Sequence, residues 1–370
     1  MRLGVDAVVD GGVRRPGDVE VVDDRVVAVG LSPAGTGLIA ARGYVDLQVN
    51  GFAGVDLLAA DEDAVRAAAR AQAATGVQAW QPTLITADET DTRRALRTLT
   101  AVAAEGGTAG RGGGILGVHL EGPFLSSEKL GTHPAEHRRD PDPARLDRLL
   151  AAGPVTYVTL APELPGALDL VRMLVARGIV VSLGHSAADA AAAHAGFDAG
   201  ARTVTHLFNA MTPFTPRRPG LAGAALSRDD VVVQVIVDGH HLAPETVRLA
   251  FLAARGRVAL VTDAIAAAGR GDGTYRLGDV EVTVADDAVR RADGTLAGSA
   301  LTMPEAVANT VALGVPLPEA VAAATVVPAT LVGRPELAAL RPGAPADLVV
   351  LDDAGRLHRT LAAGQEPSAA

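Results

Sequence analysis

Cysteine is absent from this 370-residue chain, which excludes disulfide bonds and thiolate metal ligands. Aromatic residues make up only 3% of the sequence, so alanine, valine and leucine must fill the core. The formal net charge is −10, which argues against a nucleic-acid or anionic-membrane partner. No run approaches ~18 uninterrupted apolar residues, and no basic lead precedes an apolar segment at the start. We therefore expect a cytoplasmic protein without a membrane span or signal peptide.

Two functional motifs are missing as well. The chain has no Gly-x-x-x-x-Gly-Lys-[Ser/Thr] sequence, so a phosphate-binding loop of that kind has no support. The stretch Gly184-His185-Ser186 is not a nucleophile elbow, because Ala188 stands where that motif needs its second glycine.

The middle of the chain alternates apolar strand candidates with helix candidates. Eight strands at intervals of roughly 20–45 residues predict a (β/α)8 barrel of the TIM type, which the pattern favours over an open doubly wound sheet. A Gly- and Asp-rich stretch follows the last strand and predicts a β-insert. The expected strands are 43–50, 77–84, 114–120, 154–160, 179–184, 202–206, 231–237 and 257–262. The expected helices are 62–75, 87–104, 143–152, 165–177, 187–199, 244–254, 303–313 and 317–327, with the insert at 269–298.

Both ends of the chain have a different pattern from the middle. Short apolar runs alternate with polar turns over about the first 40 residues and again over 346–355, which is typical of β-hairpins. We therefore expect a small β-sandwich domain built from 1–42 and 333–370, and a barrel domain over 43–332. The low-complexity stretch 111–114 predicts a flexible connection.

Carboxylate and imidazole groups follow several of the expected barrel strands. Glu121, His185 and His206 come directly after apolar runs, and a barrel places such strand ends at its active-site face. One carboxylate and two imidazoles form a plausible three-ligand metal set with a position open for water. Asp263 ends a later strand and could transfer protons. The alternatives are a surface Glu, structural histidines and an Asp that caps the next helix.

Other polar residues lie near these strand ends. His119 faces the same side as Glu121 and is interpreted as a partner of a ligand rather than a ligand itself. The first barrel strand carries Asp46, Gln48 and Asn50 on one face. Side-chain amides bind metals more weakly than imidazole does, so this face resembles a two-metal site from which the second metal has been lost.

Two loops have residues suited to recognising a substrate. Arg217 and Arg218 lie in a Pro-bounded turn that fits either a phosphate clamp or a solvated loop. His240 and His241 are adjacent, so at most one of them should face the site. His133 follows Glu121 in a Gly-containing loop, where it could polarise a carbonyl or lie on the surface.

These residues carry a specific family resemblance that runs essentially end to end. The chain resembles the N-acetylglucosamine-6-phosphate deacetylases of the amidohydrolase superfamily. The matching stretches are Asp46-Leu47-Gln48-Val49-Asn50-Gly51, Pro82-Thr83-Leu84-Ile85-Thr86, His119-Leu120-Glu121-Gly122-Pro123-Phe124, Gly131-Thr132-His133, Gly184-His185-Ser186, Thr205-His206-Leu207-Phe208-Asn209-Ala210-Met211, Pro219-Gly220-Leu221-Ala222-Gly223, Asp238-Gly239-His240-His241, Val261-Thr262-Asp263-Ala264 and Leu296-Ala297-Gly298-Ser299.

The resemblance implies a role for each matching position. Glu121, His185 and His206 would bind the metal, Asp263 would act as general base and acid, and His133 would polarise the carbonyl. Gln48 and Asn50 replace the His-x-His of many amidohydrolases, which implies one metal, with Gln48 in contact with a water or a weakly held second ion. The implied substrate contacts are Thr132, His133, Asn209, Ala210, Arg217, Asp238, Gly239, His240, His241, Leu296, Ala297 and Gly298.

The resemblance also implies a reaction and partners. The expected activity is hydrolysis of the acetamide of N-acetyl-D-glucosamine 6-phosphate to D-glucosamine 6-phosphate and acetate, in amino-sugar catabolism or cell-wall recycling. We expect one divalent cation per subunit, with Zn²⁺ ahead of Fe²⁺, Mn²⁺ and Co²⁺. We also expect a homodimer in which Arg217 and His241 reach the partner's site. The alternatives are an amidohydrolase for another N-acyl or cyclic amide, and a non-catalytic member of the superfamily.

Overall fold

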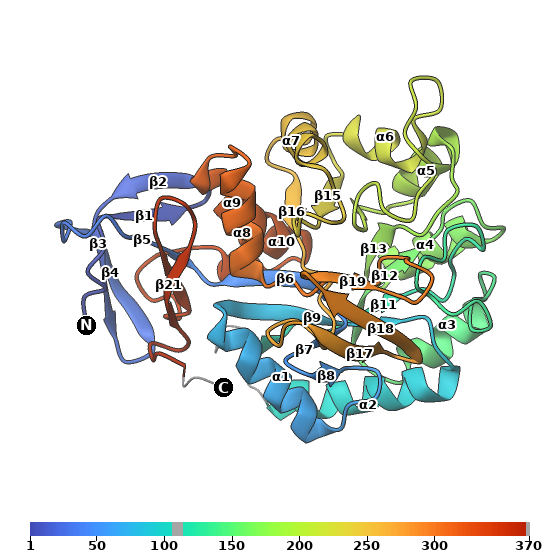
Figure 1. The fold of residues 1–370 in the computed structure, drawn as a ribbon, viewed down its shortest axis with the longest axis horizontal. Coiled ribbons are helices and arrows are strands. Elements are labelled where there is room, and N and C mark those ends of the chain that lie inside the picture. Colours follow the sequence, from blue (N-terminus) through green and yellow to red (C-terminus); the bar gives the residue numbers. More distant parts are fainter. Residues whose placement is uncertain (106–113, 368–370) are drawn as a thin grey trace.

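The computed structural model describes residues 1–105 and 114–367, and its main feature is a barrel of eight parallel strands (Figure 1). Most of the expected flexible connection at 111–114 lies outside the described residues. Adjacent barrel strands pair in parallel from β6 through to β16. A short strand, β10 (Gly114–Ile115), also pairs with β9. In order round the wall, the strands are β6 (Tyr44–Val49), β9 (Val77–Ile85), β11 (Val118–Glu121), β12 (Val155–Leu160), β13 (Val180–Leu183), β14 (Thr203–Val204), β15 (Val232–Val235) and β16 (Val258–Leu260).

The barrel is nearly closed between its last strand and its first. The Thr262 hydroxyl donates to the Asp46 carboxylate (2.6 Å), just beyond the end of β16. The backbone of Val49 forms a parallel bridge with Ala264, and the backbone N–H of Asn50 donates to the Ala264 carbonyl (2.7 Å). These contacts confirm the predicted barrel and exclude the open sheet.

Helices between the strands cover the barrel, and several begin at a capping aspartate. The Asp61 and Asp189 side chains each accept a hydrogen bond from the first turn of the helix that follows. The helices are α1 (Glu62–Ala74), α2 (Glu89–Glu105), α3 (Pro143–Leu150), α4 (Ala167–Ala176), α5 (Ala190–Asp198), α6 (Gly220–Leu226), α7 (Pro244–Ala253), α8 (Met303–Ala312), α9 (Leu317–Ala324) and α10 (Val326–Leu331).

The helices differ from the prediction in two places. Helix α6 was not expected, and the single helix expected over 317–327 is two helices. The chain breaks at Thr325, whose φ of −133° and ψ of −72° are not helical. The Thr325 hydroxyl donates to the Val321 carbonyl (2.7 Å), which completes the last turn of α9.

The two chain ends form a separate layer beside the barrel (Figure 1). A five-stranded sheet combines N-terminal and C-terminal strands, and the β3–β4 hairpin shares a buried core with it that includes Val5, Val19 and Val350. The exact division into 1–42 with 333–370 and 43–332 stays a prediction. The strands are β1 (Ala7–Asp10), β2 (Val13–Pro16), β3 (Asp18–Val22), β4 (Arg25–Leu31), β5 (Ile39–Arg42), β20 (Leu348–Leu351) and β21 (Leu357–Leu361), and a short 3-10 helix, η1, spans Pro335–Leu337.

The expected β-insert is present as three antiparallel strands, β17 (Gly273–Leu277), β18 (Val280–Ala285) and β19 (Ala288–Arg290). Its apolar face packs on Ile85 at the end of β9 and on Ile265 beyond β16. A two-stranded hairpin, β7 (Gly51–Phe52) with β8 (Val55–Asp56), lies next to it, because Asp56 accepts a hydrogen bond from the Gly278 amide (3.0 Å). The insert therefore stands at the end of the barrel where the polar strand-end residues lie.

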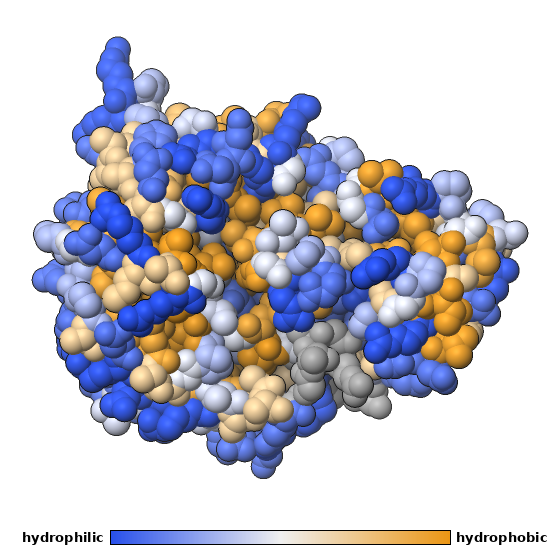
Figure 2. Space-filling view, turned by 180° about the vertical axis from the view of Figure 1, so that it is seen from behind, coloured by the Kyte–Doolittle hydropathy of each residue, from blue (hydrophilic) through white to orange (hydrophobic). Residues whose placement is uncertain are grey.

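Seen from behind, the molecule carries hydrophobic patches among hydrophilic residues, both near the middle of this face and toward its right-hand edge (Figure 2). Within residues 1–105 and 114–367, no helix has both the length and the apolar character that a membrane crossing needs.

Candidate active site and metal centre

Four chemically active side chains lie at the carboxyl ends of barrel strands. Glu121 is the last residue of β11, His185 follows β13, His206 follows β14 and Asp263 follows β16, and all four are buried. The backbone at His185, His206 and Asp263 has positive φ values of 48°, 31° and 50°. Residues other than glycine rarely adopt this conformation, and strained backbone of this kind clusters at functional sites. The sharp turn at each strand end points these side chains into the barrel mouth.

Glu121, His185 and His206 form the single cluster of potential metal ligands found among the described residues. Glu121 Oε1 lies 3.1 Å from His185 Nε2 and 3.2 Å from His206 Nε2, and the two nitrogens are 3.0 Å apart. Ligands about 2.0–2.1 Å from one tetrahedral ion are separated by roughly 3.3 Å, so the three atoms are spaced as a shared cation requires.

A hydrogen bond fixes the state of one ligand. His185 Nδ1 lies 2.9 Å from the Lys129 carbonyl oxygen, which can only accept a hydrogen bond, so Nδ1 carries the proton. In the neutral ring, the Nε2 lone pair then faces Glu121 and His206. Metal-binding histidines commonly donate their second N–H in this way. This donor set fits a divalent cation, and its nitrogen and oxygen ligands suit several transition metals.

Gln48 and Asn50 lie beside the ligand cluster, at the two positions where the sequence resemblance implies that a second metal lacks its histidines. The Gln48 side-chain amide donates to Glu121 Oε1 (3.1 Å) and to Asp263 Oδ1 (3.0 Å). The Asn50 side-chain amide also donates to Asp263 Oδ1 (2.7 Å). These two amides orient both carboxylates.

His133 lies beside the ligand cluster as a neutral donor. Burial, and after it the neighbouring His185 ring, lower the pKa of His133 to about 3. The Thr86 backbone N–H donates to His133 Nδ1 (3.2 Å), so the ring proton is on Nε2. His133 Nε2 lies 3.7 Å from Glu121 Oε2, which places its N–H in the cavity.

The two carboxylates of the site differ in how readily they ionise. Burial opposes ionisation of Glu121, but the neighbouring imidazoles of His185 and His206 outweigh it and hold the pKa of Glu121 well below its usual value. Burial and the negative charge of Glu121 raise the pKa of Asp263. Glu121 is therefore the permanent anion of the pair, and Asp263 is suited to exchanging a proton near neutral pH.

His119 has contacts of a different kind from the ligands. Its Nδ1 lies 3.2 Å from the Thr83 hydroxyl and its Nε2 lies 2.7 Å from the Thr159 hydroxyl. Burial lowers the pKa of His119 to about 4, so the ring is neutral. It supports the strand that carries Glu121 and is outside the ligand set.

A cavity of about 390 Å³ opens above the ligand cluster, and the β-insert forms one of its walls. Seven of the predicted substrate contacts line it, and six further lining residues were not in the predicted set: Asn50, Ile85, Gly131, Leu277, Arg290 and Thr295. The predicted residues on its wall are Thr132, His133, Asn209, Ala210, His241, Leu296 and Gly298.

The remaining predicted contacts lie outside this cavity. Arg217 is exposed in a turn closed by paired hydrogen bonds between Thr215 and Arg218. Asp238 accepts hydrogen bonds from the His240 and His241 amides and from His241 Nδ1 (2.7 Å), so it orients the His241 ring. Gly239 and His240 are not on the cavity wall, Gln48 is buried behind the carboxylates, and Ala297 packs in the core of the insert.

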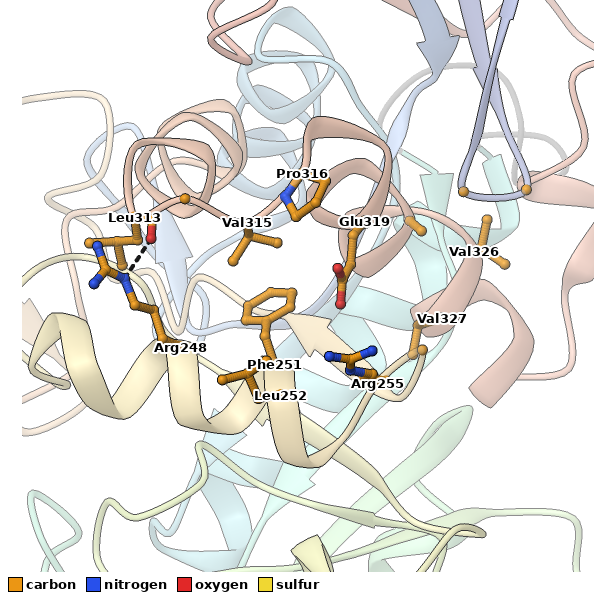
Figure 3. Close-up of a pocket in the computed structure, with 15 residues that line it drawn as sticks. Arg248, Phe251, Leu252, Arg255, Leu313, Val315, Pro316, Glu319, Val326 and Val327 are labelled. Carbon is orange, nitrogen blue, oxygen red and sulfur yellow. Dashed lines mark hydrogen bonds between the residues drawn. The ribbon is translucent and has the colours of Figure 1, made fainter.

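A larger cavity, of about 850 Å³, lies between α7, the α8–α9 connection and the β1–β2 turn (Figure 3). Its wall is mainly apolar, with Phe251 and Val315 facing one another across it, and Arg248 donates to the Leu313 carbonyl (2.6 Å). None of the ligand cluster lines this cavity, so this larger hollow is not the site of the chemistry.

The sequence profile of the amidohydrolase family matches residues 43–367. This chain belongs to the amidohydrolase family. Among curated amidohydrolases, the N-acetylglucosamine-6-phosphate deacetylase of Homo sapiens is 41% identical over 346 residues, which cover 89% of this chain and 83% of that protein. The N-acetylgalactosamine-6-phosphate deacetylase of Escherichia coli O157:H7 is 39% identical over 326 residues, which cover 87% and 86%.

Solved amidohydrolase structures are similar over the whole chain. A mutant N-acetyl-D-glucosamine-6-phosphate deacetylase from Mycobacterium smegmatis, in complex with N-acetyl-D-glucosamine-6-phosphate, is 38% identical with a TM-score of 0.92, and the match covers 100% of this chain and 99% of that one. The Thermotoga maritima N-acetylglucosamine-6-phosphate deacetylase is 31% identical with a TM-score of 0.90, and both chains are fully covered. The resemblance seen in the sequence is confirmed.

Proposed function

We propose that this amidohydrolase removes the acetyl group of N-acetyl-D-glucosamine 6-phosphate, giving D-glucosamine 6-phosphate and acetate. The observation that carries the proposal is the convergence of Glu121, His185 and His206 beside Asp263 at the barrel mouth. Relatives and solved structures with this named activity, at 31–41% identity over most of the chain, support the choice of substrate.

Glu121, His185 and His206 would hold one divalent cation, and Zn²⁺ suits their tetrahedral spacing best. When bound, such an ion acidifies water and polarises a carbonyl. The amides of Gln48 and Asn50 keep the neighbouring corner neutral, which supports a single ion per subunit.

Asp263 accepts a proton from the attacking water as the water oxygen bonds to the acetamide carbon. The Nε2–H of His133 donates to the carbonyl oxygen as negative charge develops there. Asp263 then gives its proton to the sugar nitrogen while the carbon–nitrogen bond breaks. Gln48 and Asn50 both donate to Asp263 Oδ1, so they leave Oδ2 for this proton transfer.

Phosphate recognition is assigned to His241 and Arg217. His241 lines the cavity, whereas Arg217 is exposed and absent from the cavity of its own chain. A homodimer that carries Arg217 into the partner's cavity accounts for both placements. Because a sugar phosphate is charged and is retained where it forms, we also place the reaction in the cytoplasm.

The direct test is acetate release by the purified protein, together with its metal content. We expect one equivalent of divalent metal, turnover of N-acetyl-D-glucosamine 6-phosphate, loss of turnover after chelation and recovery when Zn²⁺ is restored. An active protein that ignores phosphorylated N-acetyl sugars but hydrolyses another N-acyl compound would refute the proposed substrate. A protein that binds metal and hydrolyses no amide would be a non-catalytic family member.

N-acetyl-D-galactosamine 6-phosphate is the second candidate substrate. It differs from the first in configuration at one carbon, and a 39% identical relative bears the name of that activity. The ratio of kcat/KM for the two sugars decides between them, and we expect the glucosamine compound to be preferred. A higher kcat/KM for N-acetyl-D-galactosamine 6-phosphate would reverse the assignment of the substrate without altering the chemistry at Asp263.

A further inference from the structure

The cavity above the ligand cluster has charges of opposite sign on its two sides. The barrel side carries the carboxylates of Glu121 and Asp263, and the β-insert side carries Arg290. Arg290 is the one arginine or lysine among the described residues that line this cavity. In a chain of net charge −10, an anionic substrate needs such a local cation.

Arg290 is held in place by its backbone. It ends β19, where it pairs with Thr283 of β18, and on its other side it forms an antiparallel bridge with Leu296. Leu296 and Gly298 line the cavity next to it. The end of β19 that carries Arg290 is thus part of the site wall and is paired on both sides.

The guanidinium of Arg290 has unused donors. Its Nη1 donates to the Gly294 carbonyl oxygen (2.9 Å). Across residues 1–105 and 114–367, it forms no ion pair with a carboxylate. Its neighbour differs, since Arg291 lies 3.9 Å from the Asp293 carboxylate. One of the five guanidinium N–H donors is therefore used. The remaining donors can still form paired hydrogen bonds to two oxygens of an anion.

We propose that Arg290 binds the phosphate of the substrate from its own chain, as a third phosphate contact beside His241 and the partner's Arg217. This inference rests on the proposed function. The acetamide must lie at the barrel side, next to Asp263. C2 and C5 lie across the sugar ring from each other, so the phosphate on C6 projects away from the acetamide. A doubly charged phosphate is repelled by Glu121 and Asp263 and attracted by Arg290.

The test compares Arg290→Gln and Arg290→Lys with Arg291→Gln as the matched control. For N-acetyl-D-glucosamine 6-phosphate we expect Arg290→Gln to raise KM by about 10- to 100-fold, as loss of a charged hydrogen bond implies. For unphosphorylated N-acetyl-D-glucosamine, kcat/KM should stay within about twofold of the wild type. Arg290→Lys should show a smaller rise in KM than Arg290→Gln, because lysine keeps the positive charge but cannot donate the paired hydrogen bonds of a guanidinium. Arg291→Gln should behave as the wild type.

A binding measurement separates this inference from the proposed reaction. Affinities of wild type and Arg290→Gln for D-glucosamine 6-phosphate and D-glucosamine can be measured by calorimetry whether or not amide hydrolysis occurs. We expect weaker binding of the phosphorylated sugar alone. Equal losses on both sugars would mean that Arg290 only supports the insert through Gly294, and that result, like an unchanged affinity, would overturn the proposal. Absence of turnover in the wild type would instead refute the proposed function.

Discussion

Asp263 is the side chain on which the proposed proton transfer depends. In Asp263→Asn, the amide can still accept a hydrogen bond from Asn50, but it can neither take nor give a proton. We expect kcat to fall by about 100- to 10,000-fold, the usual contribution of a general acid–base group. Affinity for D-glucosamine 6-phosphate, measured by calorimetry, should change little. Substantial turnover by Asp263→Asn would remove this residue from the mechanism.

Glu163 is expected to control metal affinity without touching the metal. Its carboxylate accepts hydrogen bonds from the Ser186 hydroxyl (2.7 Å) and the Ala187 amide (2.6 Å), so it fixes the loop that begins at His185. Partners of this kind typically contribute 10- to 100-fold in affinity, and we expect about a tenfold loss in Glu163→Ala. Competition with a chelator measures this loss. The exposed Glu128→Ala is the control, and equal affinities in both variants would contradict the prediction.

For single residues, the sequence predicts which of them lie in the site better than it predicts their hydrogen-bond partners. Glu121, His185, His206 and Asp263 each follow an apolar strand, so their common location follows from the barrel. The hydrogen bonds from Gln48 and Asn50 to Asp263 depend on how the first barrel strand lies against the last, and no local sequence pattern predicts that. Arg290 was missed because it stands next to Arg291 in the sequence, and only folding of the insert shows which of the two arginines lines the cavity.

The junction of the first and last strands depends on the buried Asp46. This carboxylate accepts from the Thr262 hydroxyl and from the Thr262 and Gln48 amides. Burial nevertheless raises the pKa of Asp46 to about 7, from about 4 in an unfolded chain. Between these values the folded chain binds a proton that the unfolded chain has released. The free energy of unfolding should therefore fall as the pH rises toward 7.

Asp46→Asn removes this titration while its side-chain oxygen can still accept from the two amides. Urea unfolding, followed by fluorescence of the single buried Trp80, measures stability at about pH 5.5 and about pH 8. We expect the wild type to lose roughly 1–2 kcal/mol more than Asp46→Asn over this range. The exposed Asp279→Asn is the control for removal of one charge and should follow the wild type. Parallel slopes for all three proteins would contradict the prediction.

Elements were predictable where their pattern is periodic. Helix α1 follows a capping Asp and has one buried face, and it begins at the predicted residue. Helix α6 was missed because Gly220–Leu226 contains only glycine, alanine and leucine, is almost wholly buried and has no polar face. The break between α9 and α10 was missed because apolar residues continue through it, and the hydrogen bond of Thr325 to Val321 is not visible in the sequence.

For the whole molecule, alternation of strands and helices was enough to predict the barrel, and hairpin patterns at both ends predicted the terminal sheets. The proposed assembly with a second chain has no counterpart in any local sequence pattern. Two features support it. Arg217 is exposed outside its own cavity, and Phe214 in the same loop is 51% exposed, so the loop offers an apolar side chain as well as a cation to a second chain.

Mixing two defective chains tests whether Arg217 acts in the partner's site. Asp263→Asn removes the proton carrier of its own site, and Arg217→Ala weakens phosphate binding in the partner's site. In a mixed dimer, the Arg217→Ala chain keeps Asp263 and receives an intact Arg217 from the other chain, so one site is complete. Random mixing makes half of the dimers mixed, so about a quarter of wild-type activity should return. If Arg217 acts within its own chain, or if the protein is a monomer, no site becomes complete. The mixture would then show only the average of the two separate activities.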